Sequence, residues 1–116
     1  MRVIEFSRTA AQPIELFGSI ATSSIGLANG NGEVRVHCVY FGPGGIIGEH
    51  PTGFGQLFLV MDGSGWAAGA DGSRVPLSAG QGAFFESGER HSKGSEGGMT
   101  ALVVKVSTLR TDESGP

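Results

Sequence analysis

Two histidines, His50 and His91, stand 41 residues apart, and each lies in a glycine-punctuated stretch that is typical of strands. In an extended strand alternate side chains share one face, so His50, Thr52 and Gln56 point to the same side if the chain between them keeps its phase. Phe58 continues this set with an apolar side chain. Imidazole nitrogens bind iron, manganese, nickel, zinc and copper, and a glutamine can add a neutral carbonyl oxygen. These residue types indicate a pocket for a small molecule, a metal ion or both.

The spacing of the residues around the two histidines is regular. The first stretch contains Gly44, His50, Thr52, Gln56 and Gly63, and the second contains Gly80, Glu86, Gly88, His91 and Ser95. In spacing, these stretches resemble the two motifs of the cupin family. The first motif is G, five residues, H-x-H, three or four residues, E, six residues, G. The second is G, five residues, P-x-G, two residues, H, three residues, N. The resemblance implies an all-β fold, an antiparallel β-barrel or double-stranded β-helix (jelly roll).

The same resemblance implies a set of metal ligands. The ligand positions of the family match His50, Thr52, Gln56 and His91. Thr52 stands where the family has a histidine, and Gln56 stands where it has a glutamate. Two imidazoles, an amide oxygen and a hydroxyl form a marginal set of ligands. A divalent transition metal (Fe, Mn, Zn or Ni) held by His50, Gln56 and His91 is therefore a candidate cofactor of weak affinity.

A third histidine, His37, can change this count of ligands. It lies on the predicted strand before the first motif, on the face that carries Arg35. If this face lines the lumen, His37 is a replacement ligand or a general base. If the face points outward, His37 is a surface histidine or one that is hydrogen-bonded within its strand. The sequence leaves both alternatives open, because it does not fix which face of the strand points inward.

The neighbours of these histidines are interpreted as structural residues. Cys38 is expected to be a small buried hydrophobe. Arg90 and Lys93 flank His91 and indicate that this segment touches solvent.

Composition limits the class of protein. The chain has 116 residues, enough for one domain, and its formal net charge of -3 provides no basic surface for nucleic acid. No apolar run is long enough to cross a bilayer, and the first twenty residues lack a continuous apolar stretch of the kind found in signal peptides. Cys38 is the single cysteine, which fits a reduced, cytoplasmic location. The 21 glycines indicate many turns between short strands.

The strand pattern divides the chain into three parts. Residues 1–32 form an N-terminal segment with edge strands, residues 33–108 form the barrel, and residues 109–116 form a flexible tail. The predicted strands are Val3–Phe6, Glu33–Phe41, Ile46–His50, Gln56–Met61, Trp66–Ala70, Arg74–Leu77, Ala83–Glu86 and Met99–Val106. Asn29–Gly32 is the strongest turn signal, and Asp62–Gly65 is predicted to be a further turn. Both faces of Leu57–Met61 are apolar, so a second sheet or a second subunit should cover the outer face, and a homodimer is expected.

Three classes of function remain. The first is a binding protein whose lumen holds a small molecule against His50, Thr52, Gln56, Phe58 and His91. The second is a metal-dependent enzyme, such as a dioxygenase, isomerase, decarboxylase or cyclase, with His50, Gln56 and His91 as ligands and His37 as the candidate base. The third is a structural or regulatory partner with a vestigial pocket. Because Thr52 and Gln56 replace strong ligands, the sequence favours the first class and leaves enzymatic activity open.

Overall fold

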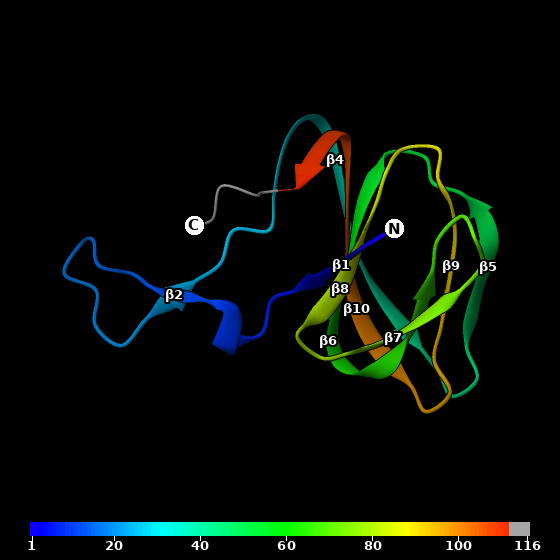
Figure 1. Cartoon of the computed structure of the whole chain (residues 1–116), viewed down its shortest axis with the longest axis horizontal. Coiled ribbons are helices and arrows are strands. Elements are labelled where there is room, and N and C mark those ends of the chain that lie inside the picture. The colour runs from blue at the N-terminus through cyan, green and yellow to red at the C-terminus, as the bar shows by residue number, and fades with distance from the viewer. Residues whose placement is uncertain (112–116) are drawn as a thin grey trace.

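The structure, a computed structural model, describes residues 1–111, which are almost entirely antiparallel strands (Figure 1). The strands are β1 (Arg2–Glu5), β2 (Gln12–Pro13), β3 (Ser23–Ser24), β4 (Ala28–Phe41), β5 (Ile46–Pro51), β6 (Gly55–Ala68), β7 (Arg74–Ser78), β8 (Gln81–Phe85), β9 (Arg90–Gly94) and β10 (Met99–Thr111). One 3-10 turn, η1 (Arg8–Ala10), is the only helical element of these residues. The predicted all-β class is confirmed. Most of the predicted tail, residues 112–116, lies outside the described part of the chain.

Strand β6 joins the two layers of the fold. Its first half pairs with β8 and β10, in a sheet of order β1-β8-β6-β10-β4. Its second half pairs with β7 and β9, and β9 also pairs with β5. The layers meet through this shared strand, as in a jelly roll, and the sheets are not closed into a complete barrel. The space between the layers is where the two motifs meet.

The length of β6 corrects one prediction. Residues 62–65 do not form a turn, because β6 continues without a break from Gly55 to Ala68. The glycine at position 63 has a φ of 76°, and the pairing with β10 shifts register between Thr100 and Ala101. A bulge of this kind bends a strand, so the glycine signal marks the point where β6 passes from one sheet to the other.

The predicted turn at Asn29–Gly32 is also wrong. These residues belong to β4, and Asn31 pairs with Thr108 of β10. Gly32 has a φ of 103°, and the register shifts between Val106 and Thr108, opposite this glycine. Asn and Gly tolerate positive φ equally well in a turn and in a bulge, so the local signal could not separate the two.

Two apolar clusters lie on opposite faces of the first sheet. The inner cluster, between the layers, includes Phe58, Val60, Leu77, Phe85 and Val103. The outer cluster contains Leu57, Leu59 and Phe84, with Ile4, Phe6, Leu27, Leu102, Val104 and Leu109 packed around them. The outer face of the doubly apolar run is therefore covered by the chain's own N-terminal segment and by neighbouring strands. Met61, predicted to share this burial, is 52% exposed.

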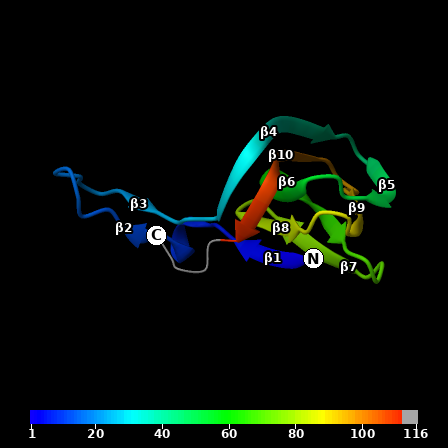
Figure 2. The ribbon, with the colours of Figure 1, turned by 90° about the horizontal axis from the view of Figure 1, so that it is seen from above.

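The segment between β1 and β4 projects from the layers as an arm (Figures 1 and 2). Strands β2 and β3 pair with each other and form a separate two-stranded sheet. The tip of the arm carries Phe17 and Ile20, which are 95% and 86% exposed. Large apolar side chains are costly to leave in water, so this tip is an unusual feature of the surface.

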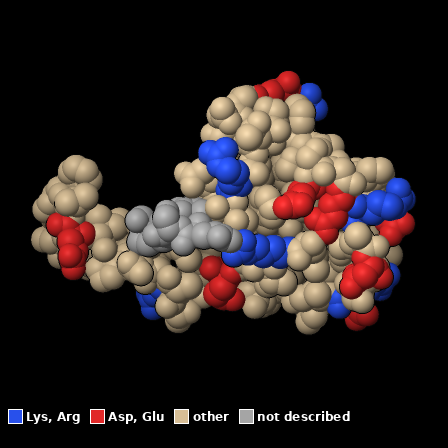
Figure 3. Space-filling model, turned by 45° about the horizontal axis from the view of Figure 1, so that its top comes forward, with Lys and Arg blue, Asp and Glu red and all other residues tan. Residues whose placement is uncertain are grey.

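The surface view in Figure 3 shows acidic and basic side chains scattered together over the visible face. No large area of one sign occupies this face, in keeping with the small net charge of -3. Within residues 1–111, no helix is long and apolar enough to cross a bilayer.

Candidate functional site

The two motif histidines meet side by side. His50 on β5 and His91 on β9 are direct partners in the antiparallel pairing of these strands. Their Nε2 atoms are 3.2 Å apart, and their ring centroids are 4.5 Å apart. The predicted convergence of these two side chains is thus a feature of the structure, and it follows from strand register because direct partners project to the same face.

Hydrogen bonding fixes the tautomers of the neutral pair. Nδ1 of His50 lies 2.7 Å from the carbonyl oxygen of Gly48, which can only accept, so Nδ1 carries the proton. Nε2 of a neutral His50 is then an acceptor, and Nε2 of His91 donates to it. The lone pair of His50 is engaged by His91, and Nδ1 of His91 is left without a proton.

His91 is held in its neutral form. Its side chain is 1% exposed, and its ring meets the Phe85 ring edge-to-face at a centroid distance of 4.6 Å. Burial, followed by the positive charges of Lys93, His50 and Lys105, lowers the pKa of His91 from 6.5 to about 3. Its Nδ1 is buried and has no hydrogen-bond partner in the described part of the chain.

The third predicted residue, Gln56, is bound to a lysine. The ammonium group of Lys93 donates a short hydrogen bond to Oε1 of Gln56, which is itself 4% exposed. Lys93 is 3% exposed, and its Nζ lies 5.0 Å and 5.2 Å from the ring centroids of Phe58 and Phe85. Burial, and secondarily the charge of Lys105, lowers the pKa of Lys93 from 10.5 to about 7. An ammonium group therefore occupies the space beside the glutamine oxygen.

These side chains border a cavity of about 380 Å³. Its lining consists of His37, Cys38, Val39, Tyr40, Ile47, His50, Gln56, Lys93, Val103 and Lys105. These residues come from β4, β5, β6, β9 and β10, so strands from both layers contribute. The volume falls in the range of pockets that hold small organic molecules.

The other predicted pocket residues do not line this cavity. Thr52 is buried, and its hydroxyl donates to the backbone oxygen of Glu89 at 2.6 Å, which ties the end of β5 to the turn before β9. Phe58 is fully buried in the inner cluster and meets Phe41 edge-to-face. Its ring forms a floor beneath Lys93. His91 lies behind His50.

The face of β4 that carries His37 points toward the interior of the fold. Val39 and Phe41 alternate with His37 along β4, and both pack into the inner cluster, so this face points toward the interior. His37 accordingly lines the cavity, although its side chain is exposed. Cys38 was expected to be buried and is exposed, because the opposite face of β4 has no layer packed against it.

The donor set is a poor fit for a divalent transition metal. Within residues 1–111, no three His, Cys, Asp or Glu side chains gather as a metal-binding group. Oε1 of Gln56 accepts from the Lys93 ammonium, and the hydroxyl of Thr52 is bonded to the Glu89 carbonyl. A metal ion beside Gln56 would face a buried positive charge, which is repulsive at short range in a site of low dielectric.

Sequence reasoning missed Lys93 and Lys105. From the sequence, Lys93 is expected in a segment that touches solvent, whereas in the structure it is one of the most buried polar residues. The missed signal is alternation, because Lys93 stands two residues after His91 and must share its face. In the same way Lys105 follows the buried Val103 on β10.

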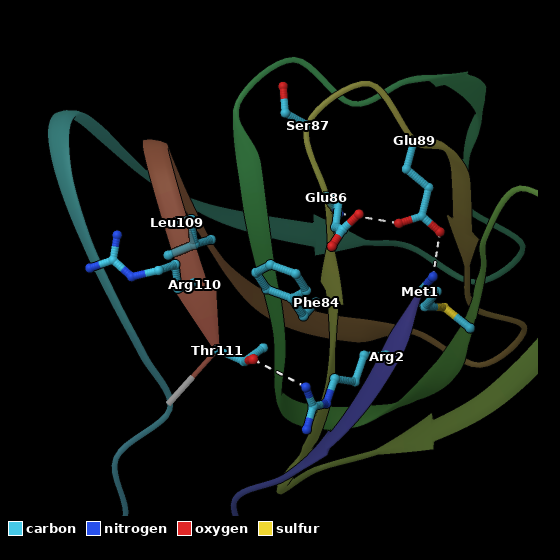
Figure 4. A pocket seen from close by; sticks show the side chains of 9 residues that line it. All are labelled: Met1, Arg2, Phe84, Glu86, Ser87, Glu89, Leu109, Arg110 and Thr111. Atoms are coloured by element: carbon cyan, nitrogen blue, oxygen red, sulfur yellow. Dashed lines mark hydrogen bonds and ion pairs between the residues drawn. The ribbon is translucent and has the colours of Figure 1, made fainter. Parts of the chain in front are cut away.

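A larger cavity, of about 660 Å³, lies outside this site (Figure 4). It is bordered by β1, the turn between β8 and β9, and the end of β10. In Figure 4 the Glu89 side chain is joined both to the N-terminal amino group of Met1 and to the backbone of Glu86. None of the predicted site residues lines it.

Solved structures with similar folds place this arrangement in a known class. A cupin superfamily protein from Desulfitobacterium hafniense DCB-2 matches with a TM-score of 0.59 at 14% identity, over 91% of this chain and 98% of that one. A predicted oxalate decarboxylase from Thermotoga maritima matches with a TM-score of 0.57 at 27% identity, over 61% and 64%. A DMSP lyase from Ruegeria pomeroyi DSS-3 matches with a TM-score of 0.59 at 19% identity, over 63% and 38%.

The chain thus has the cupin fold, and the resemblance inferred from motif spacing is confirmed at the level of the fold. It spans 64% of the length of the predicted decarboxylase and 38% of the lyase. No family model and no curated protein matches the sequence.

Proposed function

We propose that this protein binds a small organic molecule in the cavity bordered by His50, Gln56 and Lys93. The observation that carries the proposal is the meeting of these three polar side chains, from three strands, at one cavity of about 380 Å³. Apolar walls with a few convergent polar groups are typical of ligand sites. Val39, Ile47 and Val103 provide such walls, and the polar groups provide orientation.

The experiment is a fragment screen read by backbone NMR shifts. Small neutral and charged compounds are expected to shift amide signals of β5, β9 and β10 around the cavity, with saturation. His50→Ala should weaken the binding of the compounds that are found. Shifts confined to the other cavity, around Phe84 and Leu109, would contradict the proposal and move the binding site there.

The alternative is a metal-dependent enzyme that uses His50, Gln56 and His91, with His37 as base. The 3.2 Å approach of the two Nε2 atoms favours it, since two imidazoles that meet in this way are frequent metal ligands. The Lys93–Gln56 hydrogen bond weighs against it. Elemental analysis of protein purified without an affinity tag decides between the two, because an enzyme of this kind should carry about one metal ion per chain.

We also propose that two copies of the chain associate through β4 and the arm. On the outer face of β4, Val34, Val36 and Tyr40 are exposed, and the arm carries the exposed Phe17. Because β4 is an edge strand, it can pair with a second copy. Light scattering should report a dimer mass, and V36K should shift it toward the monomer. A monomer mass over a wide concentration range would contradict this.

A further inference from the structure

Both lysines of the sequence, Lys93 and Lys105, line the same cavity. The remaining six basic residues are arginines, and none of them borders it. Lys93 comes from β9 and Lys105 from β10, so the two layers each supply one ammonium group. His37 and His50 add two imidazoles to the same wall.

No carboxylate balances these charges at the cavity. None of its lining residues, all in the described part of the chain, is an aspartate or glutamate. Three of the acidic side chains in the described part of the chain are paired with other groups. Glu33 pairs with Arg35, Glu49 with Arg90, and Glu89 with the N-terminal amino group. A buried cation without a counter-charge is costly, and the cost falls when an anion binds beside it.

The lysines act on each other through space. Both lysines line the same cavity, and the charge of Lys105 contributes, after burial, to the lowered pKa of Lys93. A single small anion between them would turn this repulsion into two attractions. Oε1 of Gln56 satisfies one donor of the Lys93 ammonium and leaves two for a ligand.

The apolar walls of the cavity indicate that the uncharged part of the ligand is apolar as well. Val39, Ile47 and Val103 present apolar surface next to the charged groups. An inorganic anion would leave these walls in contact with water, whereas an organic anion buries them with its carbon skeleton. The combination fits a charged head group on an apolar body.

We propose that the cavity binds small organic carboxylates, and that the carboxylate group lies between Lys93 and Lys105 in place of a metal ion. This inference rests on the proposed function and specifies its ligand class. Lys93 then supplies at the Gln56 position the positive charge that a metal ion would otherwise supply. The apolar part of the ligand packs on Ile47 and Val103.

Lysine NMR tests this directly, because the chain has only two lysines and each gives its own side-chain signals. Protein labelled with carbon-13 in lysine is titrated with benzoate and butyrate, and with the neutral isosteres benzamide and butyramide. Both lysine signals should shift with saturation for the carboxylates. Binding of the amides should be weaker by about tenfold or more, since the amide oxygen still accepts a hydrogen bond but lacks the negative charge that attracts both ammonium groups.

Charge-matched variants inside and outside the cavity provide the control for this titration. Lys93→Gln and Lys105→Gln should each weaken benzoate binding by about tenfold or more. Arg8→Gln removes the same charge from an exposed position outside the cavity and should leave benzoate binding unchanged. The amide spectra of the variants verify that they are folded, and two separate lysine variants keep the test valid if one of them unfolds.

Each contrary outcome has its own meaning. If benzamide binds at the cavity as tightly as benzoate, the carboxylate inference fails while the small-molecule function stands. If inorganic phosphate binds as tightly as benzoate and the amides do not bind, the site is a general oxyanion site and the organic assignment fails. If no compound of either kind shifts signals around the cavity, the proposed function and the inference fail together.

Discussion

The buried ammonium group of Lys93 on β9 donates a hydrogen bond to the side-chain oxygen of Gln56 on β6, across the space between the two layers. Gln56 stands at the position where the motif of the fold has a glutamate. A glutamine keeps an acceptor there without a negative charge, so its partner is a hydrogen-bond donor and not a metal ion. The neutral Gln56 on β6 and the ammonium group of Lys93 on β9 are thus parts of one arrangement.

The first prediction concerns metal affinity. Gln56→Glu combined with Lys93→Met should bind Zn²⁺ or Mn²⁺ more tightly than the parent protein by about tenfold or more, because it joins a carboxylate to His50 and His91 and removes the competing ammonium. Isothermal titration calorimetry measures the change. Gln56→Glu alone is the control, since its carboxylate should pair with Lys93 and gain little affinity. Equal affinities for the parent and the double variant would show that Lys93 does not oppose a metal.

The fold could be predicted from the sequence because the spacing within each motif is set by the strands and turns of that short stretch. His50 and His91 keep the separations that the strands and turns of the cupin fold require, so register pairs them directly, and Gln56 borders the same cavity as His50. The turns predicted at residues 29–32 and 62–65 are wrong, because a bulge inside a strand and a turn between strands use the same backbone conformations.

Burial could be predicted less well, because it depends on what packs against a residue. Lys93 is buried because its side chain packs against Phe58, Phe85 and Gln56, and Cys38 is exposed because the outer face of β4 has no layer over it. Alternation from His91 would have indicated the inward direction of Lys93. Its contact with Gln56, 37 residues away, required the fold.

A second prediction follows from the lowered pKa of Lys93. In the unfolded chain this lysine keeps its proton up to about pH 10.5, whereas in the folded chain it loses the proton near pH 7. Between these values the unfolded state binds more protons, so the free energy of unfolding should rise as pH increases from 7 to 10.5. Below pH 7 the full cost of the buried charge remains.

Lys93→Met should remove this rise and should stabilise the protein most at or below pH 7, by an amount on the order of a few kcal/mol. Urea unfolding at several pH values measures the difference between the two proteins. Arg8→Met, at an exposed position, is the control and should run parallel to the parent. If the free energy of unfolding of Lys93→Met rises with pH as much as that of the parent protein, the rise comes from the titration of another group.

A third prediction concerns acid stability and His91. Its pKa is about 3 in the folded chain and 6.5 in the unfolded chain, so the unfolded state binds more protons between these values. The free energy of unfolding should therefore fall as pH decreases from 6.5 toward 3. His91→Gln cannot titrate and should make this fall shallower, by on the order of a few kcal/mol at pH 3. Carboxylates contribute to the fall in both proteins, so the difference between their urea-unfolding curves isolates His91.

The last prediction tests the floor of the pocket. Phe58 is fully buried, packs edge-to-face on Phe41 at a centroid distance of 6.1 Å and lies beneath the Lys93 ammonium. Phe58→Ala should lower the free energy of unfolding by about 3–5 kcal/mol, because it leaves a void in the inner cluster. The same change should reduce benzoate binding, since the void lets the Lys93 side chain withdraw from the cavity.

Ile46→Ala, at a 61% exposed position on β5, is the control and should cost less than about 1 kcal/mol. Chemical denaturation gives both values. A Phe58→Ala variant about as stable as the Ile46→Ala variant would mean that the inner cluster repacks around the lost ring and that Phe58 does not fix the position of Lys93.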